Sequence, residues 1–334
     1  MEDVVDTPEI LVLSGTEMRE LLTMRDIIEA VEEAFRAFGR GTCKIAPVIS
    51  TMIDKYEGEH EIKSGYIEGY CIGTKIVTFY KHNLSQYGIP ALSGVVVLND
   101  LNNGTLLAIL DGTYITATRT GAAGAVAAKY LARKDSQKAA IIGTGAQGRS
   151  QLAALTEVFD ISEVKAYDTI SESAARYVRE MSERYKIKII QTQSAEEAVT
   201  GADIIVTVTP STKPIVMDQW CQGGVHINAI GADAPGKQEL DPSILTHAKV
   251  VVDNLAQCLE RGEIQTAIRT GKLKKEDVYA ELSDIVLGRK PGRVNTEEIT
   301  VFDATGMSVQ DITTAHAVFH LAKKKGIGTT VSLK

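Results

Sequence analysis

Cysteine pairs, long apolar runs and clustered basic charge are all scarce in this sequence. Its four cysteines, Cys43, Cys71, Cys221 and Cys258, lie far apart without C-x-x-C spacing, which argues against a disulfide framework. No apolar segment opens the sequence at Met1-Glu2-Asp3-Val4, and no apolar run approaches the length that a bilayer requires. We therefore expect a cytoplasmic protein with no membrane partner.

Charge and missing motifs narrow the function further. The 334 residues carry 36 Lys and Arg against 43 Asp and Glu, a formal net charge of -7, and the basic residues are scattered. Nucleic acid is therefore not an expected partner. His316 and His320 are spaced i, i+4, but no H-E-x-x-H accompanies them, so we expect no metal site. No G-x-S-x-G or Cys–His signature predicts a covalent nucleophile.

A glycine motif is the most informative feature that is present. An apolar run ends in Gly143-Thr144-Gly145-Ala146-Gln147-Gly148, a G-x-G-x-x-G pattern, and Asp168 closes the next apolar run. Gly143 would allow a tight turn from strand to helix, Gly145 would let the backbone approach a pyrophosphate, and Gly148 would allow close helix packing. Asp168 would bind the ribose hydroxyls. Together these residues predict a dinucleotide site.

The pattern of elements predicts two domains in a chain of this length. Residues 73–111 form short β-rich runs, in which Asn103-Gly104 predicts a hairpin and hence antiparallel sheet. From residue 139 on, strands alternate with helices, which is typical of a parallel sheet with helices on both faces. The change of pattern near residue 120 marks the boundary. We predict an α/β protein, with a Rossmann doubly wound parallel sheet and a second α+β domain.

Two helices can be placed from local signals. Thr23-Met24-Arg25-Asp26 predicts a capping box at the start of an amphipathic helix, and Gly39 predicts its end. The small-residue segment 121–128 predicts a helix packed closely against another element. Arg119 precedes that segment.

Four places in the sequence are candidates for chemistry, and each has a structural alternative. Lys75 lies in a β-rich run and is either a functional cation or an edge-strand lysine. Arg119 is either a clamp for a phosphate or carboxylate or a solvent-facing residue. Thr207-Val208-Thr209-Pro210 ends a strand, either beside the nicotinamide half of a cofactor or simply in a turn. Asp233, among Gly and Ala, is either a general acid or part of an Asx-turn.

These pieces, in this order, resemble the ornithine cyclodeaminase/mu-crystallin family, and the resemblance covers nearly the whole chain. Among its branches, the motifs are most similar to archaeal alanine dehydrogenases, with some similarity to iminosuccinate and ketimine reductases. The most specific matches, besides the glycine loop, are Leu110-Asp111-Gly112-Thr113 with Thr118-Arg119-Thr120, Ala229-Ile230-Gly231-Ala232-Asp233 with 235–240, and Phe302-Asp303-Ala304-Thr305-Gly306 with Gln310-Asp311.

The resemblance implies a Rossmann dinucleotide-binding domain over 121–304. It also implies a substrate-binding and dimerisation domain made of 1–120 with 305–334, and thus a homodimer. It implies Lys75 and Asp233 as catalytic residues, the former in contact with the substrate's carbonyl, imine or amine and the latter as acid/base. For the cofactor, the glycine motif, the resemblance and the strand-end argument together give ten residues: Thr118, Arg119, Gly143, Gly145, Ala146, Gln147, Gly148, Asp168, Thr207 and Thr209.

The chain departs from the family pattern where the substrate carboxylate is usually bound. Basic residues are common there, but this chain has Val48 or Ile49 after Pro47 and then Glu61. Lys63 could bind the anion instead, or it could be a surface lysine. Substrate binding is thus assigned to Lys63 with Lys75 and Arg119.

The function implied by the resemblance is an NAD-dependent oxidoreductase that interconverts a small 2-imino or 2-oxo acid, with ammonia, and an L-amino acid. This would be of the alanine dehydrogenase or imine reductase type. Asp168 favours NAD over NADP, because its carboxylate would repel a 2′-phosphate. The alternatives are ornithine cyclodeaminase, a lyase that retains its cofactor, and a non-catalytic, crystallin-like nucleotide-binding protein.

Overall fold

The computed structural model describes residues 9–333, which form two compact units. Unit 1 comprises the described residues up to Arg119 together with those from Met307 on, and unit 2 comprises Thr120–Gly306. The opening Met1-Glu2-Asp3-Val4, for which the sequence predicts no apolar leader, lies outside the described residues. None of the helices in residues 9–333 is both long and apolar enough to cross a membrane.

Unit 1 is built on one mixed, eight-stranded sheet with the order β18-β1-β7-β6-β5-β4-β2, and β3 pairs with β4. All neighbouring strands are antiparallel except β1 and β7. Its elements are β1 (Ile10–Leu13), α1 (Gly15–Leu21), α2 (Met24–Arg40), β2 (Cys43–Ile45), β3 (Ile49–Ile53), η1 (Asp54–Tyr56), β4 (Gly58–Ile67), β5 (Ile72–Tyr80), α3 (Asn83–Tyr87), β6 (Leu92–Asn99), β7 (Leu106–Asp111), α12 (Ser308–Lys325) and β18 (Thr329–Val331).

Local signals predicted some of these elements. The capping box at Thr23 is confirmed, with Asp26 N bonded to Thr23 Oγ1 and Thr23 N to the Asp26 carboxylate. The predicted helix end at Gly39 is wrong: α2 continues to Arg40, and Gly41 adopts the left-handed conformation, with φ 73°, that ends it. The hairpin is confirmed, because β6 and β7 pair antiparallel around Gly104 at φ 75°.

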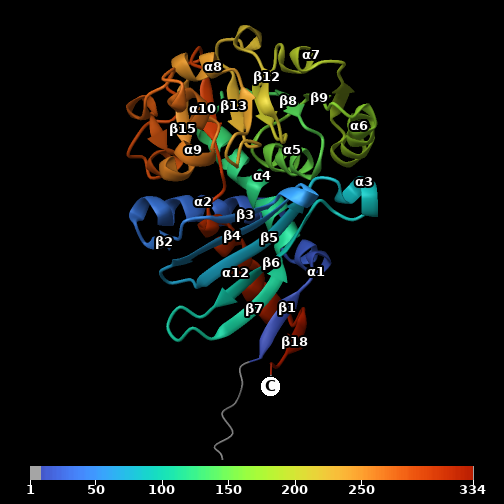
Figure 1. Ribbon diagram of the computed structural model, residues 1–334, viewed down its shortest axis with the longest axis vertical. Coiled ribbons are helices and arrows are strands. Elements are labelled where there is room, and N and C mark those ends of the chain that lie inside the picture. Colours follow the sequence, from blue (N-terminus) through green and yellow to red (C-terminus); the bar gives the residue numbers. More distant parts are fainter. Residues whose placement is uncertain (1–8, 334) are drawn as a thin grey trace, which may run out of the picture. The chain divides into compact units, whose positions relative to one another are not determined.

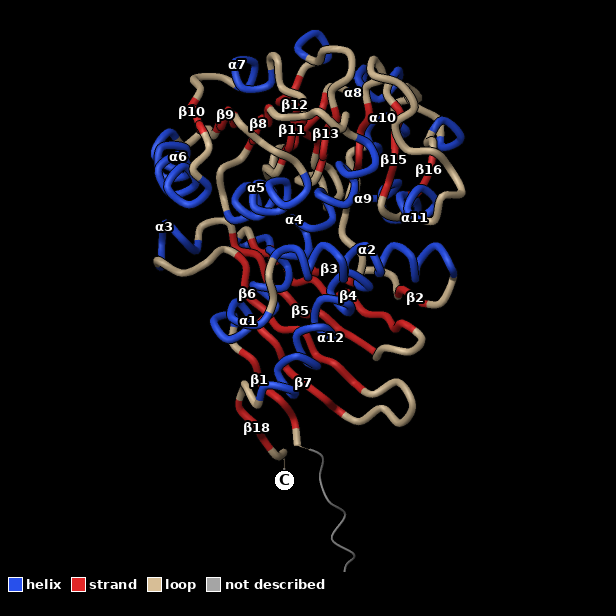
Figure 2. The backbone as a smooth tube through the Cα atoms, turned by 180° about the vertical axis from the view of Figure 1, so that it is seen from behind, coloured by secondary structure: helices blue, strands red, loops and turns tan. Residues whose placement is uncertain are grey.

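Helices cover one face of the unit 1 sheet. Figure 1 shows the strands in front of α12, and Figure 2, from behind, shows α12 and α2 in front of the strands. The close contact is visible at Gly73, where an added Cβ would lie 2.4 Å from Ile312 Cγ1. On the opposite face, Ile49, Ile62, Ile76 and Val95 stand in register across four neighbouring strands, and Ile49 is 58% and Val95 36% exposed.

Unit 2 is a doubly wound parallel sheet, as predicted, with the order β10-β9-β8-β11-β13-β17-β15-β16 and a small additional sheet of β12 and β14. Its elements are β8 (Lys138–Ile142), α5 (Ala146–Val158), β9 (Glu163–Tyr167), α6 (Ser171–Tyr185), β10 (Lys188–Gln191), α7 (Ala195–Val199), β11 (Ile204–Thr207), β12 (Thr212–Val216), η2 (Asp218–Trp220), β13 (His226–Ala229), β14 (Gln238–Leu240), α8 (Pro242–His247), β15 (Lys249–Val252), α9 (Leu255–Arg261), α10 (Ile264–Arg269), η3 (Lys275–Asp277), β16 (Ala280–Glu281), α11 (Leu282–Val286) and β17 (Thr300–Asp303).

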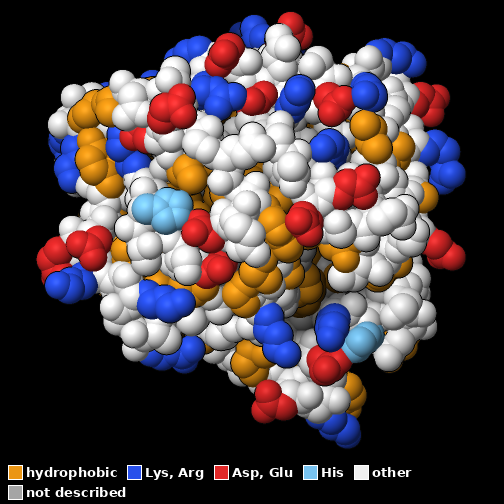
Figure 3. Space-filling view, turned by 90° about the horizontal axis from the view of Figure 1, so that it is seen from above, with side chains coloured by type: hydrophobic (Ala, Val, Ile, Leu, Met, Phe, Trp, Pro, Cys, Tyr) orange, Lys and Arg blue, Asp and Glu red, His pale blue; other side chains and the backbone are white. Residues whose placement is uncertain are grey.

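Two apolar cores lie on the two faces of this sheet. Successive strand residues alternate between them: Ile141 belongs to the core that includes Leu152 and Tyr177, and Ile142 to the core that includes Ile244 and Ile264. This alternation is the reason the strands read as continuous apolar runs in the sequence. On the molecular surface, the face in Figure 3 mixes basic and acidic side chains, and neither sign gathers into a single field.

The helix predicted from the small-residue segment 121–128 is longer in the structure. Helix α4 spans Gly112–Leu131, so Arg119 lies within it rather than ahead of it. Residues from Thr120 on belong to unit 2, where an added Cβ on Gly121 would lie 2.4 Å from Ser150 O. The predicted close packing is therefore confirmed, because only glycine fits at this contact.

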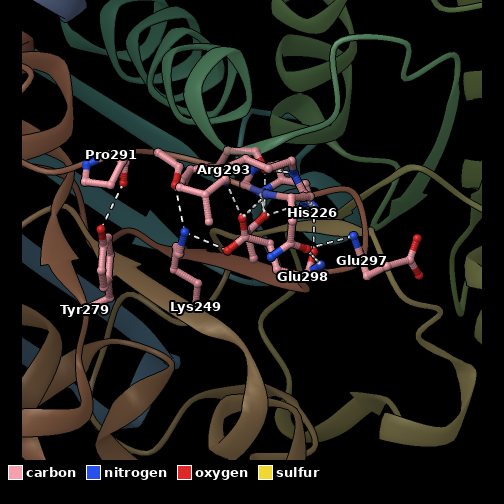
Figure 4. A network of polar contacts seen from close by, with 12 residues as sticks. His226, Lys249, Tyr279, Pro291, Arg293, Glu297 and Glu298 are labelled. Carbon is pink, nitrogen blue, oxygen red and sulfur yellow. Dashed lines mark hydrogen bonds and ion pairs between the residues drawn. The ribbon is translucent and has the colours of Figure 1, made fainter.

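A buried polar network joins α4 to the sheet of unit 2 (Figure 4). His226 bonds through Nδ1 to Thr300 Oγ1 and through Nε2 to Asn228 Oδ1, both at 2.9 Å. Asn228 Nδ2 donates to Gly124 O, which leaves Oδ1 to accept from a neutral imidazole that carries its proton on Nε2. Arg293 adds donor contacts to Leu131 O and Thr300 Oγ1.

The buried imidazole predicts acid lability. Burial lowers the pKa of His226 from 6.5 to about 3, so between these values the folded state binds fewer protons than the unfolded state. Its contribution to the free energy of unfolding should therefore fall by about 1.4 kcal/mol for each pH unit below 6.5. Guanidinium denaturation of His226→Gln should show a variant that is less stable at pH 7, by a margin that narrows toward pH 4. A constant margin would contradict a neutral, buried His226.

Candidate active site

The glycine loop of unit 2 has the geometry of an anion cradle. Gly143 has φ +102°, and its N–H bonds to Tyr167 O at 2.9 Å. An added Cβ on Gly148 would lie 2.3 Å from Gly143 O, so helix α5 can approach the loop only at glycine. Gly145 caps α5 without a side-chain hydrogen bond, and an added Cβ there would meet nothing within 4 Å. The backbone at Gly145 thus faces open space at a helix N-terminus, which suits a phosphate.

Asp168 is fixed against this loop. It follows β9, and its Oδ2 accepts hydrogen bonds from Thr144 N at 2.9 Å and Thr144 Oγ1 at 2.8 Å. Oδ1 accepts from Ile170 N at 2.9 Å. The side chain is half-buried and so keeps a solvent-facing part. Gln147, in the first turn of α5, has a buried Oε1 with no hydrogen-bond partner among residues 9–333. These features fit a nucleotide, because the oxygens of Asp168 and Gln147 could accept hydrogen bonds from the hydroxyl groups of a ribose.

A second cluster of polar residues lies at the ends of β11 and β13 in the parallel sheet. Thr207 is the last residue of β11, and Thr209 lies two residues further along the chain. Thr209 donates from both N and Oγ1 to Glu239 Oε1, at 2.6 and 2.7 Å, and Gly231 N, after β13, donates to Glu239 Oε2 at 2.8 Å. Glu239 is fully buried, and that burial raises its pKa to about 7.

Asp233 lies in the loop after β13. Its N–H donates to Gly231 O at 3.1 Å, and its carboxylate pairs with Lys237 Nζ at 2.5 Å. Arg261 Nε donates to Asp233 O at 2.7 Å. The backbone of Asp233 is therefore held while its side chain is 49% exposed, which leaves the carboxylate accessible.

Unit 1 holds a buried charge cluster, which we define as Glu61, Lys63, Lys75, Arg119 and Asp311. Lys75 Nζ lies 3.1 Å from the Asp311 carboxylate, and Arg119 Nε lies 2.9 Å from Asp311 Oδ1. Lys63, beside Lys75 on the neighbouring strand, lies 3.2 Å from Glu61 Oε1. The structure thus brings together the three cations assigned to substrate binding.

The structure contradicts the exposed alternative that the sequence left open for each of these three cations. Lys75 is only 2% exposed and lies on β5 between β4 and β6, so it is not an edge-strand lysine. Lys63, 4% exposed, is not a surface lysine, because its strand lies beneath α12. Arg119 is buried too, with Nη1 bonded to Gln310 Oε1 at 2.9 Å. Its neighbour Thr118 bonds back to Tyr114 O within α4.

Burial and the neighbouring charges set the protonation of the cluster. Burial, and then Arg119, lower the pKa of Lys75 to about 7, although Asp311 opposes the change. Burial alone would raise the pKa of Asp311, but Arg119, Lys75 and Lys63 hold it below its usual value. The cluster therefore keeps a carboxylate charged and brings a lysine close to neutrality.

Asp311, Gln310 and Glu239 contact the candidate residues, but sequence reasoning did not assign them to the site. Asp311 and Gln310 served only as matching positions of the family pattern. The available signal was the polar run Ser308, Gln310, Asp311, Thr313 and Thr314 within a helix, all of it buried in the structure. The described residues contain no group of three or more His, Cys, Asp or Glu that could hold a metal ion, and His316 and His320 contact each other at 2.9 Å.

Comparison with known proteins places the chain in a class. A model of the ornithine cyclodeaminase/mu-crystallin family matches residues 9–326, so the chain belongs to that family. It is 43% identical over 323 residues to an alanine dehydrogenase of Archaeoglobus fulgidus, covering 97% of this chain and 98% of the relative.

Two solved structures of relatives have the same fold over nearly the whole chain. An archaeal alanine dehydrogenase dimer with bound NAD has a TM-score of 0.92 and 42% identity, covering 98% of this chain and 100% of that one. A Thermococcus litoralis Δ1-pyrroline-2-carboxylate reductase with NADH and L-proline has a TM-score of 0.94 and 36% identity, covering 96% and 100%. The resemblance and the fold class are thereby confirmed.

The burial of Asp311 predicts a large stability effect. Asp311→Asn should destabilise the protein by about 3–5 kcal/mol, because Lys75 and Arg119 would be left buried without their shared anion. Urea denaturation at pH 7 measures the change. Adding Lys75→Met to Asp311→Asn removes one of the unpaired cations and should restore part of the loss. A single variant as stable as the wild type would show that the carboxylate does not compensate these charges.

Proposed function

We propose that this protein is an NAD-dependent oxidoreductase that interconverts a small 2-imino or 2-oxo acid and an L-amino acid. The observation that carries the proposal is Lys75, a fully buried amine with a pKa of about 7 beside the guanidinium of Arg119. Such an amine can polarise a carbonyl or imine and exchange a proton with it near neutral pH. The alanine dehydrogenase and pyrroline-2-carboxylate reductase relatives act on substrates of this class.

NAD fits the glycine loop. Gly143, Gly145, Ala146 and Gly148 would hold the pyrophosphate, with Asp168 and Gln147 on the ribose and the strand ends at Thr207 and Thr209 toward the nicotinamide. Thr144 fixes the Asp168 carboxylate at this position, which favours NAD over NADP. When bound, the cofactor supplies hydride exchange with the carbon that bears the nitrogen.

The remaining residues would bind the acid and move its proton. Lys75 would contact the carbonyl, imine or amine, and Asp233, with its accessible carboxylate, would act as acid/base. Lys63 and Arg119 would attract the substrate carboxylate. With Lys75 protonated, the cluster's three cations exceed its two carboxylates by one charge, which favours a monocarboxylate such as pyruvate over a dicarboxylate.

NADH consumption tests the proposal directly. Purified protein should oxidise NADH with pyruvate and ammonia or with a cyclic monocarboxylic imine, and more slowly with oxaloacetate and ammonia. Proline and ammonia formed from ornithine at constant NADH would instead identify a cyclodeaminase. NADH binding without turnover on any of these would favour the crystallin-like alternative.

Substitutions should separate turnover from cofactor binding. Lys75→Ala and Asp233→Asn should keep NADH affinity by fluorescence titration while turnover falls by about 10²- to 10⁴-fold, the effect of losing an acid/base. Lys63→Met should raise KM for the acid by roughly tenfold, since it removes a charge-assisted contact. If turnover of the Lys75 or Asp233 variant, or the KM of the Lys63 variant, stays within a few-fold of wild type, the role assigned to that residue is wrong.

We also propose that the protein is a homodimer that buries the open face of the unit 1 sheet. The apolar row Ile49, Ile62, Ile76 and Val95 lies on the face opposite α12, and burying the exposed side chains of Ile49 and Val95 against a second copy would be favourable. The archaeal alanine dehydrogenase neighbour is a dimer.

A charge placed in this row tests the dimer. Val95→Lys should give a monomer in sedimentation velocity, because pairing two such faces would bury an unpaired ammonium group. Val294→Lys, at an exposed apolar position of unit 2, is the matched control and should leave the assembly unchanged. A dimeric Val95→Lys protein would place the interface elsewhere.

A further inference from the structure

A buried carboxylate joins two loops of the parallel sheet. Glu239 lies on β14 and is fully buried. Each of its two oxygens accepts hydrogen bonds from a different loop. Oε1 accepts from Thr209 N and Oγ1, after β11, and Oε2 accepts from Gly231 N, after β13. Since β11 and β13 are neighbours in the sheet, the side chain bridges adjacent strand ends.

The bridge is tightly packed around Gly231. An added Cβ on Gly231 would lie 2.4 Å from Thr209 O and 2.6 Å from Glu239 Cδ. Gly231 O in turn accepts the N–H of Asp233 at 3.1 Å. A displacement of Gly231 would therefore be transmitted directly to the backbone of Asp233.

Further buried carboxylates hold Glu239 itself. Glu263 accepts hydrogen bonds from Glu239 N at 2.9 Å and Leu240 N at 2.8 Å, and Asp303 accepts from Glu263 N at 2.9 Å and Ile264 N at 3.1 Å. Burial raises the pKa of Glu263 well above its usual value and that of Asp303 to about 7. Backbone N–H donors oppose this shift in both residues, and for Glu239 they are joined by the Thr209 hydroxyl.

We propose that Glu239 is a positioning residue for Asp233: its carboxylate fixes the loop after β13 against the loop after β11 and so holds the proposed acid/base in place. This inference rests on the proposed function. A carboxylate suits the position because both of its oxygens must accept, and a glutamine can satisfy only one of the two loops. Its amide oxygen can still face Thr209, but its NH2 group would face the N–H of Gly231.

Glu239→Gln, compared with Glu263→Gln, tests the proposal. Both changes replace a buried carboxylate in the same chain of hydrogen bonds. Among the described residues, however, Glu263 makes no hydrogen bond to the loop after β11 or to the loop after β13. Glu239→Gln should lower kcat by roughly 10- to 100-fold, as expected for a displaced catalytic group, with NADH affinity and substrate KM within a few-fold of wild type. Glu263→Gln should lower stability with a much smaller effect on kcat, because its amide oxygen can still accept from Glu239 N and Leu240 N and so keep β14 in place.

A double-mutant cycle distinguishes positioning from general destabilisation. If Glu239 acts through Asp233, adding Glu239→Gln to Asp233→Asn should change kcat less than twofold. Independent losses that multiply in the double variant, or equal kcat losses in the Glu239 and Glu263 variants, would overturn the proposal. If Glu239→Gln does not fold, Glu239→Asp carries the same comparison, because it keeps the charge but is one methylene too short to reach both loops.

Hydrogen exchange gives a readout that does not depend on turnover. Amides of residues 231–233 should exchange faster in Glu239→Gln than in wild type or Glu263→Gln. A wild-type protein that turns over no substrate would reject the proposed function, while this exchange pattern would still report whether Glu239 fixes the loop. Unchanged exchange in Glu239→Gln would reject the positioning role whatever the activity.

Discussion

The requirement that a buried charge be compensated shapes both units of this protein. In unit 1 the compensation comes from opposite charges: Asp311 lies between Lys75 and Arg119, and its charge is stabilised by both. In unit 2 it comes from hydrogen-bond donors, because Glu239 and Asp303 each accept hydrogen bonds from successive segments of main chain. The same constraint therefore gives an amine with a pKa of about 7 in one unit and two loops joined by hydrogen bonds to one carboxylate in the other.

The parallel sheet determines where those loops gather. Strands β8, β11 and β13 are neighbours and run in the same direction, so the residues that follow them lie along one edge. Glycine is required where this edge is crowded, since an added Cβ would lie 2.7 Å from Val208 O at Gly143 and 2.4 Å from Thr209 O at Gly231. The proposed nucleotide-binding edge and the proposed support for Asp233 thus arise from the same topology.

Local signals predicted the strand–helix order of unit 2 and part of unit 1. The capping box at Thr23, the hairpin at Gly104 and the strand–helix alternation of unit 2 depend on interactions a few residues apart, and all are present. Two helix boundaries were missed for different reasons. Helix α2 passes through Gly39 because its apolar stripe is buried, so tertiary packing overrides the local preference. Helix α4 begins at Gly112 because Asp111 Oδ1 accepts from Thr113 N and Tyr114 N, a local cap that lies ahead of the small-residue segment.

The sequence by itself determined the family, the glycine loop and the candidate residues, because these depend on residue types at fixed spacing. It left open whether Lys75, Lys63 and Arg119 were functional or exposed, and only the tertiary structure decided that all three are buried around two carboxylates. Asp311 is 236 residues from Lys75, and Glu239 is 30 from Thr209. Pairings at such separations are created by strand register and helix packing, and no local pattern records them.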